Sequence, residues 1–453
     1  NQSLMDGWYA ASVEAFEDSP LLYRQQGYNP PMDRIKATQF ADIPEAENNT
    51  IVTNKVISSG AHFYDKNTVS AETFVFYTDE DGAGNFKITP ETYRQQADLM
   101  ITSGVNEMIY HGFPYVYNDE DGSYGVQNWS AFCSPYSGYD IPTTFSESDP
   151  FWPYVKNLND YVSRLQFLMK QGDPSVDVLV YLPLFASETS AKYTTVTNQL
   201  NASGIAWDYV NEELLESASY TGGHLMVNDK EYDALILPNV DTIELSAMQA
   251  VNALSEAGAP IAVYGVAPSK QPGYQDGKYA EVDAQVAALA AQVTARSNSP
   301  LVTDETALSA FTANYANPEI TYEANAALNF VRRDYGDMGN LIFVRNTSAN
   351  ATDYRIVCGA ADTKAYVLDA RTGEIHETAI QDGAVTGSLD GMDSMVLLFA
   401  ENSQFSAAQL TAGDPLAVQE TSSAATLDNW TLRVDGQDVQ DYTASGAAAL
   451  GMW

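Results

Sequence analysis

The sequence has few cysteines, few histidines and few basic residues, and each shortage narrows the classes of protein it can be. Its 453 residues include two distant cysteines, Cys133 and Cys358, from which no disulfide framework can be read. The four histidines show none of the short spacings found in zinc sites. Against 60 Asp and Glu there are 22 Lys and Arg, a formal net charge of -38. Because that charge repels phosphate backbones and anionic lipids, neither nucleic acid nor a membrane is an expected partner.

The chain also lacks an apolar run long enough to cross a membrane. Its hydrophobic content of 45% is ordinary for a globular protein, and its length allows about three domains. The acidic balance suits a secreted protein, and the Asn-X-Ser/Thr sequons leave glycosylation open. Helical spacing of Leu4 and Trp8 at the beginning, and a candidate strand shortly before the end, lead us to expect an internal part of a longer protein.

Residues 1–172 alternate between strand and helix patterns. The β-rich run 68–76 carries Glu72 in its middle, an amphipathic helix follows, and the short strand 106–112 carries His111. In a (β/α)8 barrel the chemistry lies at the C-terminal ends of the strands, so Glu72 is the first candidate for catalysis. The pattern supplies about three strand–helix units, too few to close a barrel. The missing barrel part is expected upstream or on another chain.

The remaining residues change character twice. The nearly continuous apolar strand 176–182, followed by shorter strands and helices, is typical of a doubly wound parallel sheet, although no glycine-rich phosphate loop follows it. Short, turn-separated strands after that indicate a β-sandwich. We therefore predict a multidomain α/β plus β fold with four parts: a C-terminal part of a (β/α)8 barrel at 1–172, a flavodoxin-like α/β domain at 173–317, a β-sandwich at 318–401 and the start of a further β-domain at 402–453.

The order of several short motifs resembles one enzyme family. These motifs are Arg24-Gln25-Gln26-Gly27-Tyr28, Asp42-Ile43-Pro44-Glu45-Ala46-Glu47, Ser58-Ser59-Gly60-Ala61-His62, Val69-Ser70-Ala71-Glu72 and Ile109-Tyr110-His111-Gly112. Together with the domains behind them, they resemble glycoside hydrolase family 106, the α-L-rhamnosidases. The resemblance implies an inverting hydrolase that removes terminal α-L-rhamnose and holds calcium in its active site. It makes Glu72 the general base and places the general acid on an earlier barrel strand, which this chain does not contain.

Further site residues follow from strand ends and from the resemblance. The expected substrate-binding residues are Arg24, Gln25, Tyr28, Tyr110, His111 and Trp129, and the expected metal ligand is Glu47. Glu45 and Glu47 stand near a predicted helix start, around 46–59, where a carboxylate also compensates the helix dipole. The acidic loops 77–82 and 117–122 contain oxygen ligands for calcium, but Asp-Gly turns explain them more simply.

Two other functions stay open at the level of the sequence. A β-galactosidase-like hydrolase also appends α/β and β domains to a barrel, and substrate preference would separate it from a rhamnosidase. A catalytically inactive carbohydrate-binding protein would show no second carboxylate facing Glu72. An inverting hydrolase would instead place two carboxyl groups about 6.5–9.5 Å apart.

Overall fold

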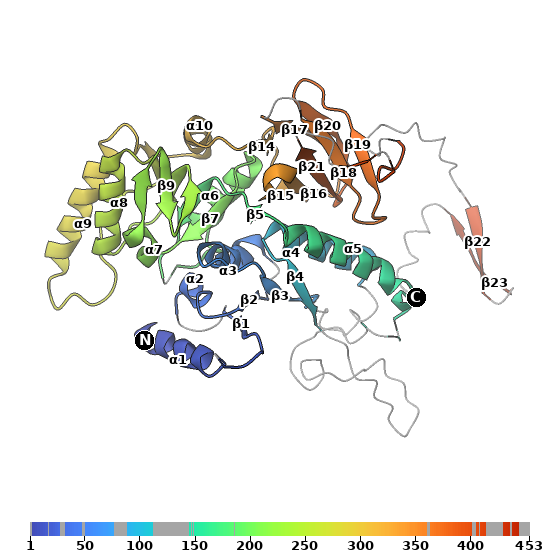
Figure 1. The fold of residues 1–453 in the computed structure, drawn as a ribbon, viewed down its shortest axis with the longest axis horizontal. Coiled ribbons are helices and arrows are strands. Elements are labelled where there is room, and N and C mark those ends of the chain that lie inside the picture. The colour runs from blue at the N-terminus through green and yellow to red at the C-terminus, as the bar shows by residue number, and fades with distance from the viewer. Residues whose placement is uncertain are drawn as a thin grey trace.

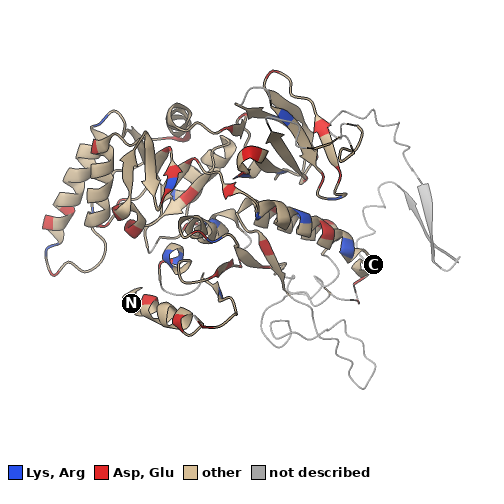
Figure 2. Cartoon of the chain, viewed as in Figure 1, with Lys and Arg blue, Asp and Glu red and all other residues tan. Residues whose placement is uncertain are grey.

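Figure 1 shows a computed structural model of the chain. The structure describes residues 2–16, 18–27, 32–47, 50–76, 88–111, 145, 147, 149–184, 186–359, 363–400, 405–406 and 408–413, together with the backbone of 429–434 and 437–443. Three main parts follow one another along the chain, in blue to teal, green to yellow, and orange (Figure 1). Asp and Glu occur in all three parts (Figure 2). None of the helices within the described ranges is long and apolar enough to span a membrane.

The first part is a four-stranded parallel sheet whose strands lie in sequence order. Its strands are β1 (Arg24–Gln26), β2 (Ile43–Ala46), β3 (Ser70–Thr73) and β4 (Glu107–Tyr110). The helices around it are α1 (Gln2–Glu14), α2 (Arg34–Ala37), α3 (Ile51–Phe63), α4 (Pro90–Thr102), η1 (Trp152–Tyr154) and α5 (Val155–Met169). Helix α4 is capped at its start, because Thr89 Oγ1 accepts the Thr92 N–H at 3.2 Å. Successive parallel strands joined by helices make this a run of β/α units.

The two faces of this sheet differ in polarity because side chains alternate along a strand. Ala46, Ala71 and Met108 are buried among the apolar side chains of α4 and α5. Glu45 and Glu72 occupy alternate positions in β2 and β3, next to those alanines in sequence, and belong to the opposite face. One face therefore supplies the core, and the other collects polar groups.

One local prediction in this part needs correction. The helix predicted around 46–59 begins at Ile51, and the preceding segment is strand β2. Pairing with β1 and β3 on both sides fixes residues 43–46 as a strand, whatever their helical propensity. Helix α1 forms as expected, but Leu4 and Trp8 keep 76% and 57% of their surface exposed. The described residues thus leave the apolar stripe of this helix uncovered.

The second part is a five-stranded parallel sheet in the order β13-β12-β11-β6-β7. Its strands are β6 (Val178–Tyr181), β7 (Trp207–Val210), β11 (Ala234–Leu237), β12 (Ile261–Tyr264) and β13 (Leu301–Val302). Its helices are α6 (Ala191–Ala202), α7 (Glu212–Ser217), α8 (Leu245–Ala257), α9 (Tyr279–Thr294) and α10 (Glu305–Tyr315). In order along the chain, the strands follow the 2-1-3-4-5 pattern of flavodoxin-like folds. Four of them are buried along their whole length, which explains their nearly continuous apolar sequence.

Sequence patterns missed one element of this part. A three-stranded antiparallel sheet of β8 (Ser219–Thr221), β9 (His224–Val227) and β10 (Lys230–Tyr232) lies between β7 and β11. These strands are only three or four residues long, and their polar residues are typical of a loop, so the pattern did not indicate strands. Helix α8 ends at Gly258, which stops it with φ +104°, a left-handed conformation that glycine adopts without strain.

The third part consists of two antiparallel sheets with an apolar core between them. The six-stranded sheet has the order β19-β18-β21-β16-β15-β5 and the three-stranded sheet the order β14-β17-β20. The elements are β5 (Asp173–Pro174), β14 (Ile320–Tyr322), β15 (Leu328–Asp334), η2 (Gly336–Met338), β16 (Asn340–Asn346), β17 (Thr352–Cys358), β18 (Lys364–Leu368), β19 (Ile375–Thr378), β20 (Ala384–Leu389) and β21 (Ser394–Ala400). The six-stranded sheet also packs its other face on α4 and α5, so β21 is buried throughout. A separate hairpin of β22 (Asn429–Val434) and β23 (Gln437–Thr443) follows.

A buried carboxylate joins the first and second parts. Asp208 of β7 has no exposed surface, and three side chains of α3 contact it. Lys55 Nζ lies 2.9 Å from Asp208 Oδ1, His62 Nδ1 lies 2.8 Å from Oδ2, and Ser59 Oγ donates to Oδ1 at 3.1 Å. Burial by itself would raise the pKa of Asp208, but His62 and Lys55 together lower it well below its ordinary range. Asp208 is therefore held ionised at this boundary.

A second buried cluster joins the first part to the sandwich. Arg94 of α4 pairs with Asp98 at 2.5 Å and donates to the carbonyl of Met392 at 2.6 Å. Tyr161 of α5 donates to the same Asp98 and lies 2.9 Å from the hydroxyl of Ser394. Burial raises the pKa of Asp98 to about 6, although Arg94 opposes the shift. These polar contacts fix α4 and α5 against β21.

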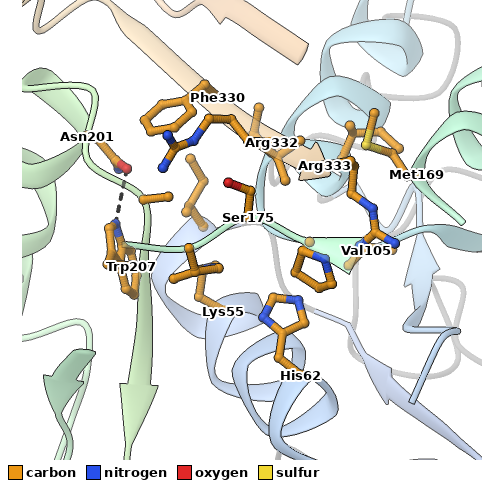
Figure 3. Close-up of a pocket in the computed structure, with 18 residues that line it drawn as sticks. Lys55, His62, Val105, Met169, Ser175, Asn201, Trp207, Phe330, Arg332 and Arg333 are labelled. Atoms are coloured by element: carbon orange, nitrogen blue, oxygen red, sulfur yellow. Dashed lines mark hydrogen bonds between the residues drawn. The ribbon is translucent and has the colours of Figure 1, made fainter. Parts of the chain in front are cut away.

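All three parts meet around the small cavity drawn in Figure 3. Lys55 and His62 of α3, Trp207 of β7, and Arg332 and Arg333 of β15 line it. Its volume is about 40 Å³, which is room for ordered water but not for a sugar. We interpret it as a polar junction between the parts rather than as a substrate site.

The sandwich settles which of two neighbouring sequons can carry a glycan in the folded protein. Asn346 is buried, and its Nδ2 donates to the carbonyls of Asn350, Leu389 and Asp390 at 2.8–3.0 Å. Asn350 is exposed. When the protein is secreted from a eukaryotic host, we expect a glycan on Asn350 and none on Asn346. Peptide mapping after enzymatic deglycosylation checks this, and a glycosylated Asn346 in folded material would contradict the packing described here.

Candidate active site

Glu72 lies at the centre of a polar cluster on the sheet of the first part. Gln26 of β1 donates from Nε2 to Glu72 Oε2 at 2.7 Å. His111, directly after β4, hydrogen-bonds through Nδ1 to Glu72 Oε1 at 2.5 Å. An ionised carboxylate can only accept, so Nδ1 carries the proton of that bond. The Glu72 side chain is still 28% exposed, so a ligand can reach a carboxylate whose two oxygens are already oriented.

The backbone after Glu72 explains why the strand ends there. Phe74 has φ +69°, in the left-handed region that a residue with a bulky side chain rarely adopts. Its carbonyl accepts the Phe76 N–H at 3.1 Å, closing a tight turn. The Phe74 ring is buried against Tyr93 and Tyr110, with ring centroids 4.9 and 4.7 Å away. Burial of the Phe74 ring offsets the strain of this backbone turn. Because the turn ends strand β3, Glu72 lies at the end of that strand.

Glu45 is the second carboxylate on this face. It is buried, accepts the Ser70 hydroxyl at 2.8 Å, and pairs with Arg24 Nε at 3.1 Å. The sequence placed Glu45 near a helix start, but strand β2 contains it. With both partners holding the same oxygen, Glu45 fixes Arg24 next to the cluster.

Glu47 follows β2 and lies within electrostatic reach of Glu72 and His111. Burial raises its pKa, the negative charge of Glu72 raises it further, and His111 opposes the shift. Its Oε2 is buried without a hydrogen-bond partner among the described residues. A hard oxygen of this kind suits calcium. Within the described ranges no three His, Cys, Asp or Glu residues form a metal-binding group, so Glu47 would supply one ligand of such a site.

The predicted site residues fall into three groups. Arg24, Glu47, Glu72 and His111 come together on the polar face of the sheet. Tyr110 does not, because its ring packs on Phe74 on the opposite face and its hydroxyl donates to Asn159 of α5 at 3.1 Å. Tyr28 and Trp129 lie outside the described residues, as do the acidic loops 77–82 and 117–122.

The sequence analysis named the residue next to Gln26 as a substrate-binding residue, and not Gln26 itself. The prediction named Gln25, but Gln26 makes the contact with Glu72. Side chains at positions two apart share a face of a strand, so Arg24 and Gln26 lie together and Gln25 points the other way. The signal was present in the sequence, since fixing Arg24 on the site side selects Gln26.

Comparisons with known proteins agree with this fold. The sequence profile of the α-L-rhamnosidases, glycoside hydrolase family 106, matches residues 13–381. A protein of Formosa agariphila named "Putative beta-glucuronidase" is 23% identical over 366 residues, which cover 79% of this chain and 29% of that protein. This chain therefore spans less than a third of that relative.

Two solved structures show the same fold at low sequence identity. A rhamnosidase from Novosphingobium sp. PP1Y superposes with a TM-score of 0.64 at 18% identity, covering 94% of this chain and 40% of that one. A β-galactosidase from Bacillus circulans sp. alkalophilus superposes with a TM-score of 0.55 at 10% identity, covering 87% of this chain and 66% of that one. The family profile extends over most of the chain, including every residue of the cluster around Glu72. The chain belongs to the α-L-rhamnosidase family of glycoside hydrolases.

Proposed function

We propose that the protein hydrolyses terminal α-L-rhamnosides with inversion, and that Glu72 is its general base. The observation that carries the proposal is the position of Glu72. It stands at the end of a parallel strand, is open to solvent, and has one oxygen bonded to Gln26 and the other to His111. Placement at the C-terminal end of a strand is where barrel enzymes carry their chemistry.

In the proposed reaction, Glu72 takes a proton from the water that attacks the anomeric carbon. The two hydrogen bonds from Gln26 and His111 hold the carboxylate in one orientation, so less reordering is needed as the proton moves. A second carboxylic acid must give its proton to the glycosidic oxygen as the bond to the leaving group breaks. For inversion it would stand about 6.5–9.5 Å from Glu72, leaving space for the water.

The second acid is proposed to come from additional β/α units beside β1. Within the described residues, β1 pairs with β2 alone, so its other edge is open. A groove of about 640 Å³ lies between α1 and the segment that leads into β1 and reaches Tyr23, directly before that strand. Leu21 and Leu22 along it keep 65% and 69% of their surface exposed. Further strands and helices that complete a barrel would cover both the groove and the edge, and would face Glu72 from the far side.

Calcium is proposed as a bound ion with Glu47 among its ligands, where it would add positive charge near the sugar hydroxyls.

A chelator should lower the activity of the full-length enzyme, and Glu47→Gln should weaken calcium binding about tenfold or more, measured by calorimetry without substrate. Because the pKa of Glu47 is raised, protons should compete with calcium at a higher pH than for an ordinary glutamate. The matched control is Glu107→Gln, since Glu107 pairs with Lys170 at 2.5 Å. Equal calcium affinity in both variants would remove Glu47 from the site.

A substrate panel tests the function itself. The full-length protein is offered aryl α-L-rhamnoside, β-D-galactoside and β-D-glucuronide, and the first sugar anomer released is identified by NMR. We expect cleavage of the rhamnoside with release of the inverted anomer. Preference for the galactoside would favour a β-galactosidase-like enzyme, and no cleavage of any substrate would favour a carbohydrate-binding protein.

A further inference from the structure

The second part of the fold contains a pocket that the proposed chemistry does not use. The strand order of its sheet reverses between β6 and β11, which lie side by side although β7 of the same sheet separates them in sequence. In open α/β sheets, ligands bind in the crevice at the C-terminal ends of the two strands at such a switch point. A pocket of about 330 Å³ lies there, formed by the loops that follow β6, β7, β11 and β12. That volume is within the ~300–1,000 Å³ range of small-molecule sites.

The walls of this pocket are held rigidly. Glu212, the first residue of α7, accepts the Tyr181 hydroxyl at 2.9 Å and the Leu184 N–H at 3.3 Å. This ties the loop after β6 to α7. On the other side, Thr242 forms a parallel bridge with Lys270, which joins the loops after β11 and β12. A pocket bounded by such contacts is formed before a ligand arrives.

The charges of the pocket argue against a phosphate or a nucleotide. Glu212 occupies the first position of α7, and Glu244 is the N-cap of α8. Two of the three helix N-termini at the pocket therefore already carry carboxylates, which disfavour an anion there, whereas α6, with Ser190 as its N-cap, has no acidic residue in its first turn. A third carboxylate, Asp241, lies 3.6 Å from Lys192 and 3.9 Å from Lys270 and is compensated by them. The pocket is left with an excess of hydrogen-bond acceptors and no free positive charge among its described lining residues.

The remaining lining is mixed in a way that favours an uncharged polyhydroxylated ligand. Ser187, Ser190 and Thr242 contribute hydroxyl groups next to the carboxylates. The apolar wall is formed by Pro183, Leu184, Ala186, Val240, Ile243 and Pro272. A pyranose offers hydroxyl donors on its rim and an apolar C–H face, and both match these walls. We propose that the switch-point pocket binds a neutral sugar of monosaccharide size, at a second site separate from Glu72. The choice of L-rhamnose as the first probe rests on the proposed function, whereas the site itself does not.

Two substitutions test the pocket without touching the polar cluster around Glu72. Ser187→Trp fills it from an exposed position, and Asp241→Asn removes one acceptor from a side chain that is 52% exposed. The matched control is Glu231→Gln, an exposed carboxylate on β10 of the same domain. Calorimetric titration of the full-length protein with L-rhamnose should show two binding events. Ser187→Trp should abolish one of them, and Asp241→Asn should weaken the same event about tenfold, the expected loss of one hydrogen bond to a charged group.

Crystals soaked with L-rhamnose, D-galactose or inorganic phosphate locate the ligand directly. Sugar density beside Asp241 in the native protein, absent in Ser187→Trp, would support the proposal. Density for phosphate there, or no sugar in the pocket with any probe, would overturn it. The hydrolytic assay is scored separately, so an inactive enzyme that still binds sugar at this pocket disproves the proposed function alone. If Ser187→Trp melts early, the Asp241→Asn titration decides the question.

Discussion

Glu72→Gln in the full-length enzyme is expected to lower kcat for an aryl α-L-rhamnoside by roughly 10²–10⁴-fold, the usual contribution of a general base. The amide keeps the size of the side chain but cannot take a proton from water. Folding should change little, because Glu72 is partly exposed and lies at the end of its strand. The melting temperature and the KM are measured beside kcat to separate loss of chemistry from loss of structure.

The control for this experiment is Glu107→Gln on the neighbouring strand β4. Glu107 is likewise a hydrogen-bonded carboxylate, 2.5 Å from Lys170 Nζ, so the same change of charge and shape is made nearby. Its kcat should stay within a few-fold of the parent. If both variants lose activity equally, or if Glu72→Gln retains it, Glu72 is not the base.

Asp208→Asn is expected to destabilise the folded protein by about 3 kcal/mol. The substitution leaves the Lys55 ammonium facing a neutral amide in a largely buried site, and removing one partner of a buried pair costs ~3–5 kcal/mol. The lower end applies because Lys55 keeps 11% of its surface exposed. The measurement is the free energy of unfolding in urea at neutral pH.

The matched control is an ion pair at the surface that also joins the first and second parts of the fold. Asp65 pairs with Lys230 at 2.6 Å, but Asp65 is 78% exposed, so Asp65→Asn should change stability by less than ~1 kcal/mol.

The pKa of Asp208 is lower in the folded than in the unfolded protein, so its contribution to stability is full above about pH 4 and is lost as the pH falls further. In the Asp208→Asn variant, the free energy of unfolding should therefore fall less steeply below about pH 4. Equal losses in both variants would mean that burial of this charge does not matter.

The sequence predicted those parts of the site that depend on local pattern. Glu72 and His111 were found because both fall in short predicted strands, and the parallel pairing of β3 with β4 brings them together. Gln25 was named instead of Gln26 because the strand alternation, which places Gln26 on the same face as Arg24, was not applied to this segment.

Contacts between distant segments could not be predicted in this way. Asp208 and its partners on α3 are about 150 positions apart, and nothing in either segment alone indicates the other. The strand β2 was read as a helix start for a similar reason, since only its pairing with β1 and β3 makes it a strand. The charge of an isolated glutamate such as Glu45 likewise gave no sign that Arg24 and Ser70 would enclose it.

The two-residue strand β5 determines how the α/β part is tethered. The chain leaves β5, which pairs with β15 at the edge of the six-stranded sheet, runs through the whole α/β part, and returns through Ala316 to β14 of the other sandwich sheet. Ser175 donates its N–H to the carbonyl of Arg332 at 3.3 Å, so the outgoing connection stays on the sandwich. The α/β part is thus a domain inserted into the chain of the sandwich, and both of its connections lead to sandwich strands. Two connections restrict its rotation more than a single linker would, and removing the whole insertion would leave β5 and β14 in place.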